Sequence, residues 1–294
     1  MKNKFTPYLM LTPYFFFYAC FSLFPIIFSF GISFTSWDGF GSISFAGFAN
    51  YIRVFTKDKF FYQSLKNTVI FMMFDTPSLI ILGLITATLL KDYLKRIRES
   101  VQLINFLPFI TTPVAIGMIF QQMFDRKSGI VNMFLTSIGI KPIYWLGIAW
   151  PARAVVIFMN IWHGYGYMMV LFLAGLATIP DELYEAAKID GAKWWHSFFR
   201  ITIPLLRPIF AFVITTSVIN AFRLFDEPQL LFSGATYALG GPDRAAMTVV
   251  MRFYEASFRQ FEFGYGSAMA YCLFIIIAII SYVLVRVLNR DNQS

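Results

Sequence analysis

The chain has 294 residues, of which 58% are apolar, 19% aromatic and only 14% charged. A soluble domain carries about 25% charged residues, so this composition and the mean hydropathy of +0.64 exclude an ordinary soluble protein. Low glycine and proline contents and only two cysteines exclude collagen-like, disordered and disulfide-built chains. The net charge of +8 does not indicate nucleic acid, because the basic residues stand in short gaps between apolar segments. The sequence therefore predicts a polytopic membrane protein with no nucleic-acid partner.

Six apolar segments are long enough to cross a bilayer, whose hydrocarbon core of roughly 30 Å needs about 20 helical residues. They cover residues 8–36, 66–90, 101–124, 153–176, 208–232 and 265–288. Helices are expected because lipid offers no water to backbone amides, and no alternating pattern indicates a barrel. We predict an all-α fold with six transmembrane helices, and Thr111-Thr112-Pro113 marks the place for a kink in the third.

Lysine and arginine positions predict the orientation, because cytoplasmic loops of membrane proteins carry an excess of them. The clearest such loop is Lys91-Asp-Tyr-Leu-Lys-Arg-Ile-Arg98. It places residues 1–7, 91–100, 177–207 and the tail after 285 inside, so both termini are predicted to be cytoplasmic. The first apolar stretch is too long for the apolar region of a cleaved signal, and we expect it to be retained as a helix.

The loop between the fourth and fifth segments, residues 179–204, has the pattern of two short helices. Pro180 opens the first, Gly191 ends it, and Leu183, Ala186, Ala187 and Asp190 share one face. The second presents four aromatic residues, Trp194, Trp195, Phe198 and Phe199, before Pro204 and Pro208 break it. Such a pair suits either docking into a partner's groove or lying at the bilayer interface, and physical reasoning leaves both open.

The run Glu185-Ala-Ala-Lys-Ile-Asp-Gly191, followed nine residues later by Ile201-Thr-Ile-Pro204, resembles the EAA loop of permeases from bacterial binding-protein-dependent ABC importers. Only the leucine that usually precedes the proline is replaced, by Ile203. The similarity extends over residues 60–290 and is greatest to the MalF branch of sugar permeases. It includes Leu107-Pro108, Asn160-Ile-Trp-His-Gly-Tyr165, Gly240-Gly-Pro242 and Phe263-Gly-Tyr-Gly-Ser-Ala268.

The resemblance implies a MetI-like core of a type I ABC importer in residues 61–290, after a first helix and external loop in residues 1–60. It implies a multi-pass subunit of the bacterial cytoplasmic membrane, with a second homologous permease, two ATP-binding subunits and an extracytoplasmic solute-binding protein as partners. The loop 177–207 would couple transport to the ATPase. Its matching coupling residues are Glu185, Ala186, Ala187, Asp190, Gly191, Ile201 and Pro204.

Enzymatic chemistry is not expected in this chain. No Gly-x-x-x-x-Gly-Lys-Ser/Thr run that would cradle nucleotide phosphates occurs, so ATP hydrolysis is expected from a partner. His163 and His196 are the only histidines, and no histidine, cysteine or carboxylate cluster has metal-ligand spacing. We therefore predict no catalytic residue, metal or cofactor.

Polar residues within the apolar segments are candidates for a substrate pathway, because ionisable groups at membrane depth are costly. Asn160, His163, Gly164 and Tyr167 lie at i, i+3, i+4 and i+7, on one face of a helix. The resemblance implies that a sugar is held at mid-membrane by residues at the matching positions. These are Phe109, Pro113, Asn160, His163, Gly164, Tyr167, Phe222 and Arg223.

His163 and Arg223 depart from the maltose-type pattern, so the charge of the cargo stays open. Arg223 can bind a carboxylate of an acidic sugar, or form a local ion pair with Asp226 and Glu227 in the transporter of a neutral one. His163 can instead bond between helices, and Asp75 is expected to be structural, balancing a charge on the partner permease. An importer for another solute class and an ion-driven secondary transporter are the alternative functions. A secondary transporter would require two repeated halves in the sequence and a relay of buried carboxylates, and neither is evident.

Overall fold

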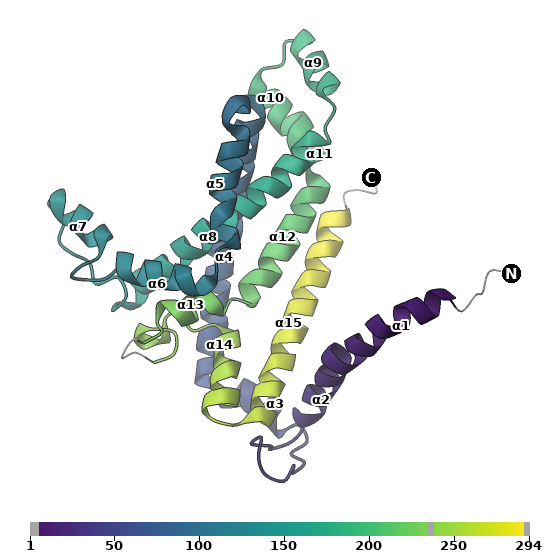
Figure 1. The fold of residues 1–294 in the computed structure, drawn as a ribbon, viewed down its shortest axis with the longest axis vertical. Helices are drawn as coiled ribbons and strands as arrows, with labels where there is room; N and C mark the ends of the chain where they lie inside the picture. Colours follow the sequence, from purple (N-terminus) through teal and green to yellow (C-terminus); the bar gives the residue numbers. More distant parts are fainter. Residues whose placement is uncertain (1–5, 235–237, 291–294) are drawn as a thin grey trace. The chain divides into compact units, whose positions relative to one another are not determined.

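The computed structural model describes residues 6–234 and 238–290, and the regular elements of these residues are helices (Figure 1). They are α1 (Thr6–Tyr18), α2 (Phe24–Ile32), α3 (Ala49–Thr56), α4 (Lys59–Asp92), α5 (Arg98–Ile110), α6 (Pro113–Met123), α7 (Ile130–Ser137), α8 (Ala149–Ala177), α9 (Asp181–Ile189), α10 (Trp194–Ser197), α11 (Ile203–Leu205), α12 (Arg207–Phe222), α13 (Asp226–Leu231), α14 (Val249–Tyr254) and α15 (Phe263–Arg290). Single π-helical turns, Ala19–Leu23 and Phe198–Thr202, connect α1 to α2 and α10 to α11.

Among the described residues, four stretches of continuous helix are long and apolar enough to cross a membrane. They are Tyr8–Ile32, Lys59–Asp92, Ala149–Ala177 and Phe263–Leu288. They match the first, second, fourth and sixth predicted segments. Contrary to the prediction, neither the third nor the fifth segment forms one continuous helix. Each is part of a bent pair, with angles of 96° between α5 and α6 and 67° between the Trp194–Leu205 stretch and α12. Six spans result only if each bent pair counts as one.

The break in the third segment lies at the predicted kink. Thr111 and Thr112 adopt extended backbone conformations, with ψ of 141° and 137°, and Pro113 opens α6. Proline lacks the N–H that would continue the hydrogen bonds of α5, while it fits the first turn of a new helix. A run of apolar residues is therefore interrupted by a sharp turn that hydropathy alone does not detect.

The fifth predicted segment, 208–232, is wrong as one helix, because α12 ends at Phe222 and α13 begins at Asp226. Pro228 accounts for part of this separation. In a continuous helix its N–H would donate to the Leu224 carbonyl, and proline has none to donate. The Thr248 hydroxyl donates to that carbonyl instead, at 2.6 Å.

The described chain forms two compact units, one of which joins the segment up to Tyr62 to Arg252–Ile276. In this unit α15 contacts α2, since the Tyr271 hydroxyl donates to the Ile26 carbonyl at 2.6 Å. A buried ion pair joins Arg252 to Asp58, with Nη2 and Oδ2 2.8 Å apart, and the Tyr265 hydroxyl donates to the same oxygen at 2.7 Å.

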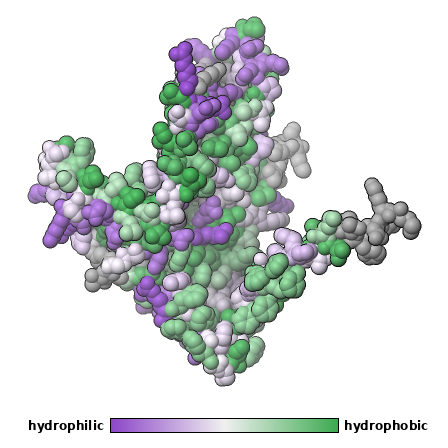
Figure 2. Space-filling view, viewed as in Figure 1, coloured by the Kyte–Doolittle hydropathy of each residue, from purple (hydrophilic) through white to green (hydrophobic). Residues whose placement is uncertain are grey.

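The other unit comprises Gln63–Met251 and the chain from Ile277 onward, and its core packs around α8. Apolar side chains of α4, α6 and α8, such as Phe71, Phe120 and Val156, form one buried cluster. Gly166 brings α5 against α8, because a Cβ there would stand 1.8 Å from the Asn105 carbonyl oxygen. Figure 2 shows hydrophilic residues over α9 and α10 and hydrophobic residues over α5.

Candidate functional site

The predicted polar face of α8 contacts acidic residues from two other elements. Asn160 donates from Nδ2 to Oδ2 of Asp75, on α4, at 2.9 Å. His163, one turn further along, places Nδ1 3.3 Å from Oε1 of Glu227, on α13. Both acids are largely sequestered from solvent, Asp75 with 5% of its surface exposed and the Glu227 side chain with 16%. The polar face thus contacts one carboxyl group of α4 and one of α13.

Four polar atoms of this cluster are buried and have no hydrogen-bond partner among residues 6–234 and 238–290. They are Asp75 Oδ1, Thr76 Oγ1, Asn160 Oδ1 and His163 Nε2. A buried polar atom without a partner lowers stability by about 1–3 kcal/mol, so a group of such atoms is unusual in a protein core. The cluster therefore has hydrogen-bonding capacity that the described residues leave unused.

An aromatic pair lies beside the polar face. Phe109, from α5, stacks on Tyr167 with ring centroids 4.6 Å apart and planes 8° from parallel. Its ring also lies 6.0 Å from the His163 ring. Gly164 packs against Leu79, where a Cβ would meet Leu79 Cδ2 at 3.1 Å. Flat aromatic faces beside hydrogen-bonding groups are suited to binding an amphipathic ligand such as a sugar ring.

The other three predicted substrate residues lie apart from this cluster. Pro113 is half-buried at the start of α6, Phe222 is buried with 1% of its surface exposed, and Arg223 is exposed where α12 ends. None makes a hydrogen bond, ion pair or ring contact with the polar face within the described chain. The local ion pair suggested for Arg223 is absent from the described residues, because Glu227 contacts His163 instead.

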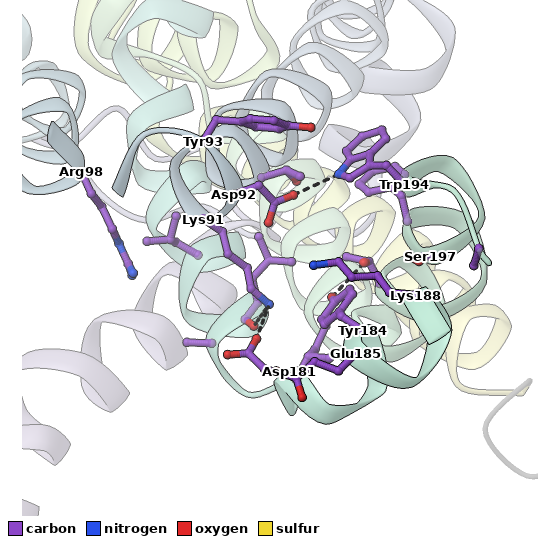
Figure 3. Close-up of a pocket in the computed structure, with 18 residues that line it drawn as sticks. Lys91, Asp92, Tyr93, Arg98, Asp181, Tyr184, Glu185, Lys188, Trp194 and Ser197 are labelled. Atoms are coloured by element: carbon purple, nitrogen blue, oxygen red, sulfur yellow. Dashed lines mark hydrogen bonds and ion pairs between the residues drawn. The ribbon is translucent and has the colours of Figure 1, made fainter. Parts of the chain in front are cut away.

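The predicted two-helix loop is built as expected at its first helix. Pro180 precedes α9, Asp181 and Glu182 occupy its first turn, and Gly191 follows its end with φ of +75°. Acidic residues at the start of a helix are favoured by its dipole. One face of α9 lines a cavity of about 860 Å³ together with the ends of α4 and α8 (Figure 3). The lining residues of α9 are Asp181, Tyr184, Glu185 and Lys188.

Contacts across this cavity anchor the loop to the long helices (Figure 3). Lys91, near the end of α4, donates to the Leu176 carbonyl at 3.2 Å and lies 3.8 Å from Asp181 Oδ1. The Trp194 indole donates to Asp92 Oδ2 at 3.0 Å. The loop is therefore held to α4 by charge and by a hydrogen bond, while Lys91 also joins α4 to α8.

The predicted coupling residues lie on different faces of the loop. Glu185 lines the large cavity, Ala186 is exposed, and Pro204 lies within α11. The remaining four line a second cavity of about 430 Å³ and are Ala187, Asp190, Gly191 and Ile201. The four aromatic residues differ in exposure. Trp194, Trp195 and Phe199 are exposed, and Phe198 is half-buried, with its ring stacked on Trp194 at 5.1 Å between centroids.

The family comparison matches residues 79–293 to the binding-protein-dependent transport system inner membrane component. The chain belongs to this family. The resemblance noted in the sequence is thereby confirmed, and this transport permease is an integral membrane protein.

Curated relatives of the permease have sugar-transport names. It is 34% identical to the lactose transport system permease protein LacF of Rhizobium radiobacter, over 90% of this chain and 87% of the relative. It is 31% identical to the arabinooligosaccharides transport system permease protein AraP of Halalkalibacterium halodurans, over 95% and 86%. It is 30% identical to the trehalose/maltose transport system permease protein MalF of Thermococcus litoralis, over 83% and 79%.

Solved structures give the permease a neighbour of the same architecture. A chain in the crystal structure of a bacterial ABC transporter involved in the import of the acidic polysaccharide alginate is 25% identical and superposes with a TM-score of 0.81. The alignment covers 99% of this chain and 96% of that one. A second structure, of the bacterial alginate transporter with a periplasmic protein bound to alginate pentasaccharide, gives a TM-score of 0.80.

Proposed function

We propose that this permease forms half of the translocation pathway of an ATP-driven importer for a sugar or oligosaccharide. It would lie in the bacterial cytoplasmic membrane with both termini cytoplasmic and pair with a homologous permease. Two ATP-binding subunits would drive it through the loop 177–207, and an extracytoplasmic solute-binding protein would deliver the cargo. The sugar-transport names of its relatives support this assignment.

The observation that carries the proposal is that α8 links the polar–aromatic cluster to the α9 loop. Asn160, His163 and Tyr167 lie on the same helix that ends at Ala177, four residues before α9 begins. The ten residues from Tyr167 to Ala177 span about 15 Å as helix. A continuous helix moves as one body, so a displacement of the α9 loop by an ATPase would reach the cluster directly.

The test is purification of the permease with its partner subunits and binding protein, followed by reconstitution into vesicles. ATP hydrolysis and uptake are measured with lactose, arabinotriose, maltose and alginate oligosaccharides. We expect at least one sugar to stimulate hydrolysis and to accumulate, and Asn160→Ala to reduce its uptake. Stimulation only by amino acids, polyamines or phosphodiesters would move the permease to another solute class. Uptake driven by an ion gradient without ATP would overturn the proposal.

Arg223 favours an acidic sugar as the cargo. Its guanidinium is exposed at the end of α12 and makes no ion pair in the described chain, while the neighbouring acid Glu227 contacts His163. An arginine without an acidic partner can bind a sugar carboxylate through two parallel hydrogen bonds. The neighbour of known structure belongs to a transporter of an acidic polysaccharide, which agrees with this chemistry.

The charge of the cargo is tested with Arg223→Gln, with Arg259→Gln as the matched exposed control. We expect Arg223→Gln to lower stimulation by alginate oligosaccharides on the order of tenfold, the loss of a charged bidentate contact, and the control to retain it. Unchanged stimulation would assign a neutral cargo. Phe109→Ala should then be the most harmful substitution, because ring stacking would carry the binding. Phe222→Ala is a poorer probe, since truncating a buried phenylalanine costs about 3–5 kcal/mol of stability.

A further inference from the structure

Asp75 and Glu227 are largely buried acids that form no ion pair with a lysine or arginine within the described chain. Asp75 accepts from the Asn160 amide, and Glu227 lies against His163. Among the described residues no three histidine, cysteine, aspartate or glutamate side chains are grouped to hold a metal ion. Both acids contact residues on one face of α8, three positions apart. This arrangement allows the two acids to orient the side chains of that face.

A carboxylate determines which way round an amide side chain lies. A carboxyl oxygen that accepts from an amide faces the NH2 end of that amide and not its carbonyl end. The 2.9 Å contact between Asn160 Nδ2 and Asp75 Oδ2 therefore fixes the amide, and Oδ1 is left as a free acceptor. Without Asp75 the two ends of the amide would have no such preference.

Glu227 has the same effect on the His163 ring. Nδ1 lies 3.3 Å from a carboxylate oxygen, and the negative charge of that group favours a proton on Nδ1. The ring is then oriented with Nε2 on its other side, where it is buried and has no partner in the described chain. Each acid thus leaves one α8 side chain with one unused polar atom.

We propose that Asp75 and Glu227 are positioning residues, which hold Asn160 and His163 so that Oδ1 and Nε2, buried in this structure, meet hydroxyl groups of the transported sugar when the pathway opens. The proposal rests on the proposed function and assigns a role to two residues that would not themselves touch the cargo. Phe109 and Tyr167 lie beside these atoms and supply the aromatic face on which a sugar ring stacks. Sugar hydroxyls would satisfy the atoms that the chain leaves unpaired.

The test uses the complete transporter in vesicles and the sugar of the above panel that the intact complex transports best. Asp75→Asn and Glu227→Gln keep side-chain shape but can present either end of an amide, so the orientation of Asn160 or His163 is lost. The measured quantity is sugar transported per ATP hydrolysed, with sugar-loaded binding protein at saturation. We expect this ratio to fall on the order of tenfold, because a binding residue loses the partner that orients it. ATP hydrolysis should stay unchanged within about twofold.

Two matched variants control for local disturbance. Thr86→Val removes a hydroxyl of α4 that lies outside the cluster and donates to the Leu82 carbonyl, and Asp226→Asn removes the exposed acid next to Glu227. Both should retain the transport ratio of the intact complex. A double variant separates positioning from packing, because coupled residues give non-additive effects. Asp75→Asn should cause no further loss once Asn160→Ala is present, whereas an additive loss would overturn the positioning role.

The outcomes distinguish this inference from the proposed function. If the intact complex transports none of the sugars, the proposed function fails. If it transports one and both acid variants keep its ratio of sugar to ATP, the positioning role fails while the function stands. Should Asp75→Asn not insert, Glu227→Gln carries the test alone, because Glu227 lies on the short helix α13 rather than in a long span.

Discussion

Gly191 ends α9 in a left-handed conformation, and nothing lies within 4 Å of where its Cβ would stand. Within this chain the constraint is therefore backbone conformation, which aspartate and asparagine tolerate better than other residues. We expect Gly191→Asp to insert normally but to lower uptake on the order of tenfold, because its charge would lie in the proposed ATPase interface. Uptake and membrane level measured in the same cells check this.

Gly191→Asn is the matched control, since asparagine has the size of aspartate without its charge. Loss of uptake in both variants would indicate that the partner approaches too closely for any side chain. Loss in Gly191→Asp alone would indicate charge repulsion. Uptake at the wild-type rate by Gly191→Asp would remove Gly191 from the coupling residues.

Asp58 links pH to the stability of the unit that contains α2, α3 and the first part of α15. Burial alone would raise the pKa of this carboxyl, but hydrogen bonds from Tyr265 and Arg252 outweigh burial and lower the pKa below its usual value. A lowered pKa in the folded state means that the stabilisation is complete above about pH 4 and is lost as the pH falls further. Asp58→Asn should lower the Tm at neutral pH, at a cost of about 3–5 kcal/mol for a broken buried pair.

Thermal unfolding in detergent from about pH 7 to about pH 3 tests this dependence. The Tm difference between Asp58→Asn and the intact chain should shrink as the pH falls below about 4. Asp38→Asn is the control, because hydrogen bonds from Gly41 and Phe40 also lower the pKa of Asp38, although its side chain is solvated. Equal Tm values for Asp58→Asn and the intact chain at neutral pH would contradict the role of the pair.

Residues on one helix could be placed from the sequence, but contacts between helices could not. The spacing of Asn160, His163 and Tyr167 predicts a shared face because the helical period is fixed. Asp75 meets Asn160 across 85 positions, and that contact depends on how α4 and α8 approach one another. Glu227 was expected near Arg223 at i+4, a rule that holds only within one helix, and α12 ends before it is reached.

Helical elements could be predicted where apolar runs were uninterrupted and not where the chain turns within one. Segments 66–90 and 153–176 lie inside α4 and α8, since length and hydropathy suffice for a straight span. Segments 101–124 and 208–232 each contain a break. Pro113 indicated where the third segment could bend but not by how much, because a proline is compatible with a mild kink or a sharp turn. The fifth breaks at Arg223, between α12 and α13, where hydropathy averaged over the segment hides a few charged residues.

The α9 loop shows a further limit at this scale. The face predicted for docking, with Leu183 and Ala186, differs from the face with Asp181, Tyr184 and Lys188, which lines the cavity against α4 and α8. The opposite face carries Leu183, Ala186 and Ile189, all exposed in this chain. Helical periodicity separates the two faces but does not reveal which one the rest of the chain covers. The face with Ala186 is therefore the one left for a docking partner.

At the scale of the whole molecule, a single chain offers a sugar only part of a polar pathway. Only 6% of the span Tyr8–Ile32 and 39% of the span Ala149–Ala177 lie buried within the chain. Lipid or another subunit must therefore cover most of their surface. Lipid can cover apolar side chains, but it cannot satisfy the hydroxyl groups of a crossing sugar, each of which costs several kcal/mol without a partner. The cluster on α8 therefore needs a second polar surface opposite it, which supports the proposed pairing with a homologous permease.

Orientation is a property of the whole molecule, and it decides whether the α9 loop can meet an ATPase. Single cysteines at Arg96 and Lys193 should be protected from an impermeant thiol reagent in intact cells, whereas ones at Lys57, Lys127 and Arg259 should be labelled. These five positions are exposed. Cys20 and Cys272 are replaced first, since Cys20 is exposed. The opposite labelling pattern would put the α9 loop on the side without ATP, and an ATP-driven role for this loop would then be impossible.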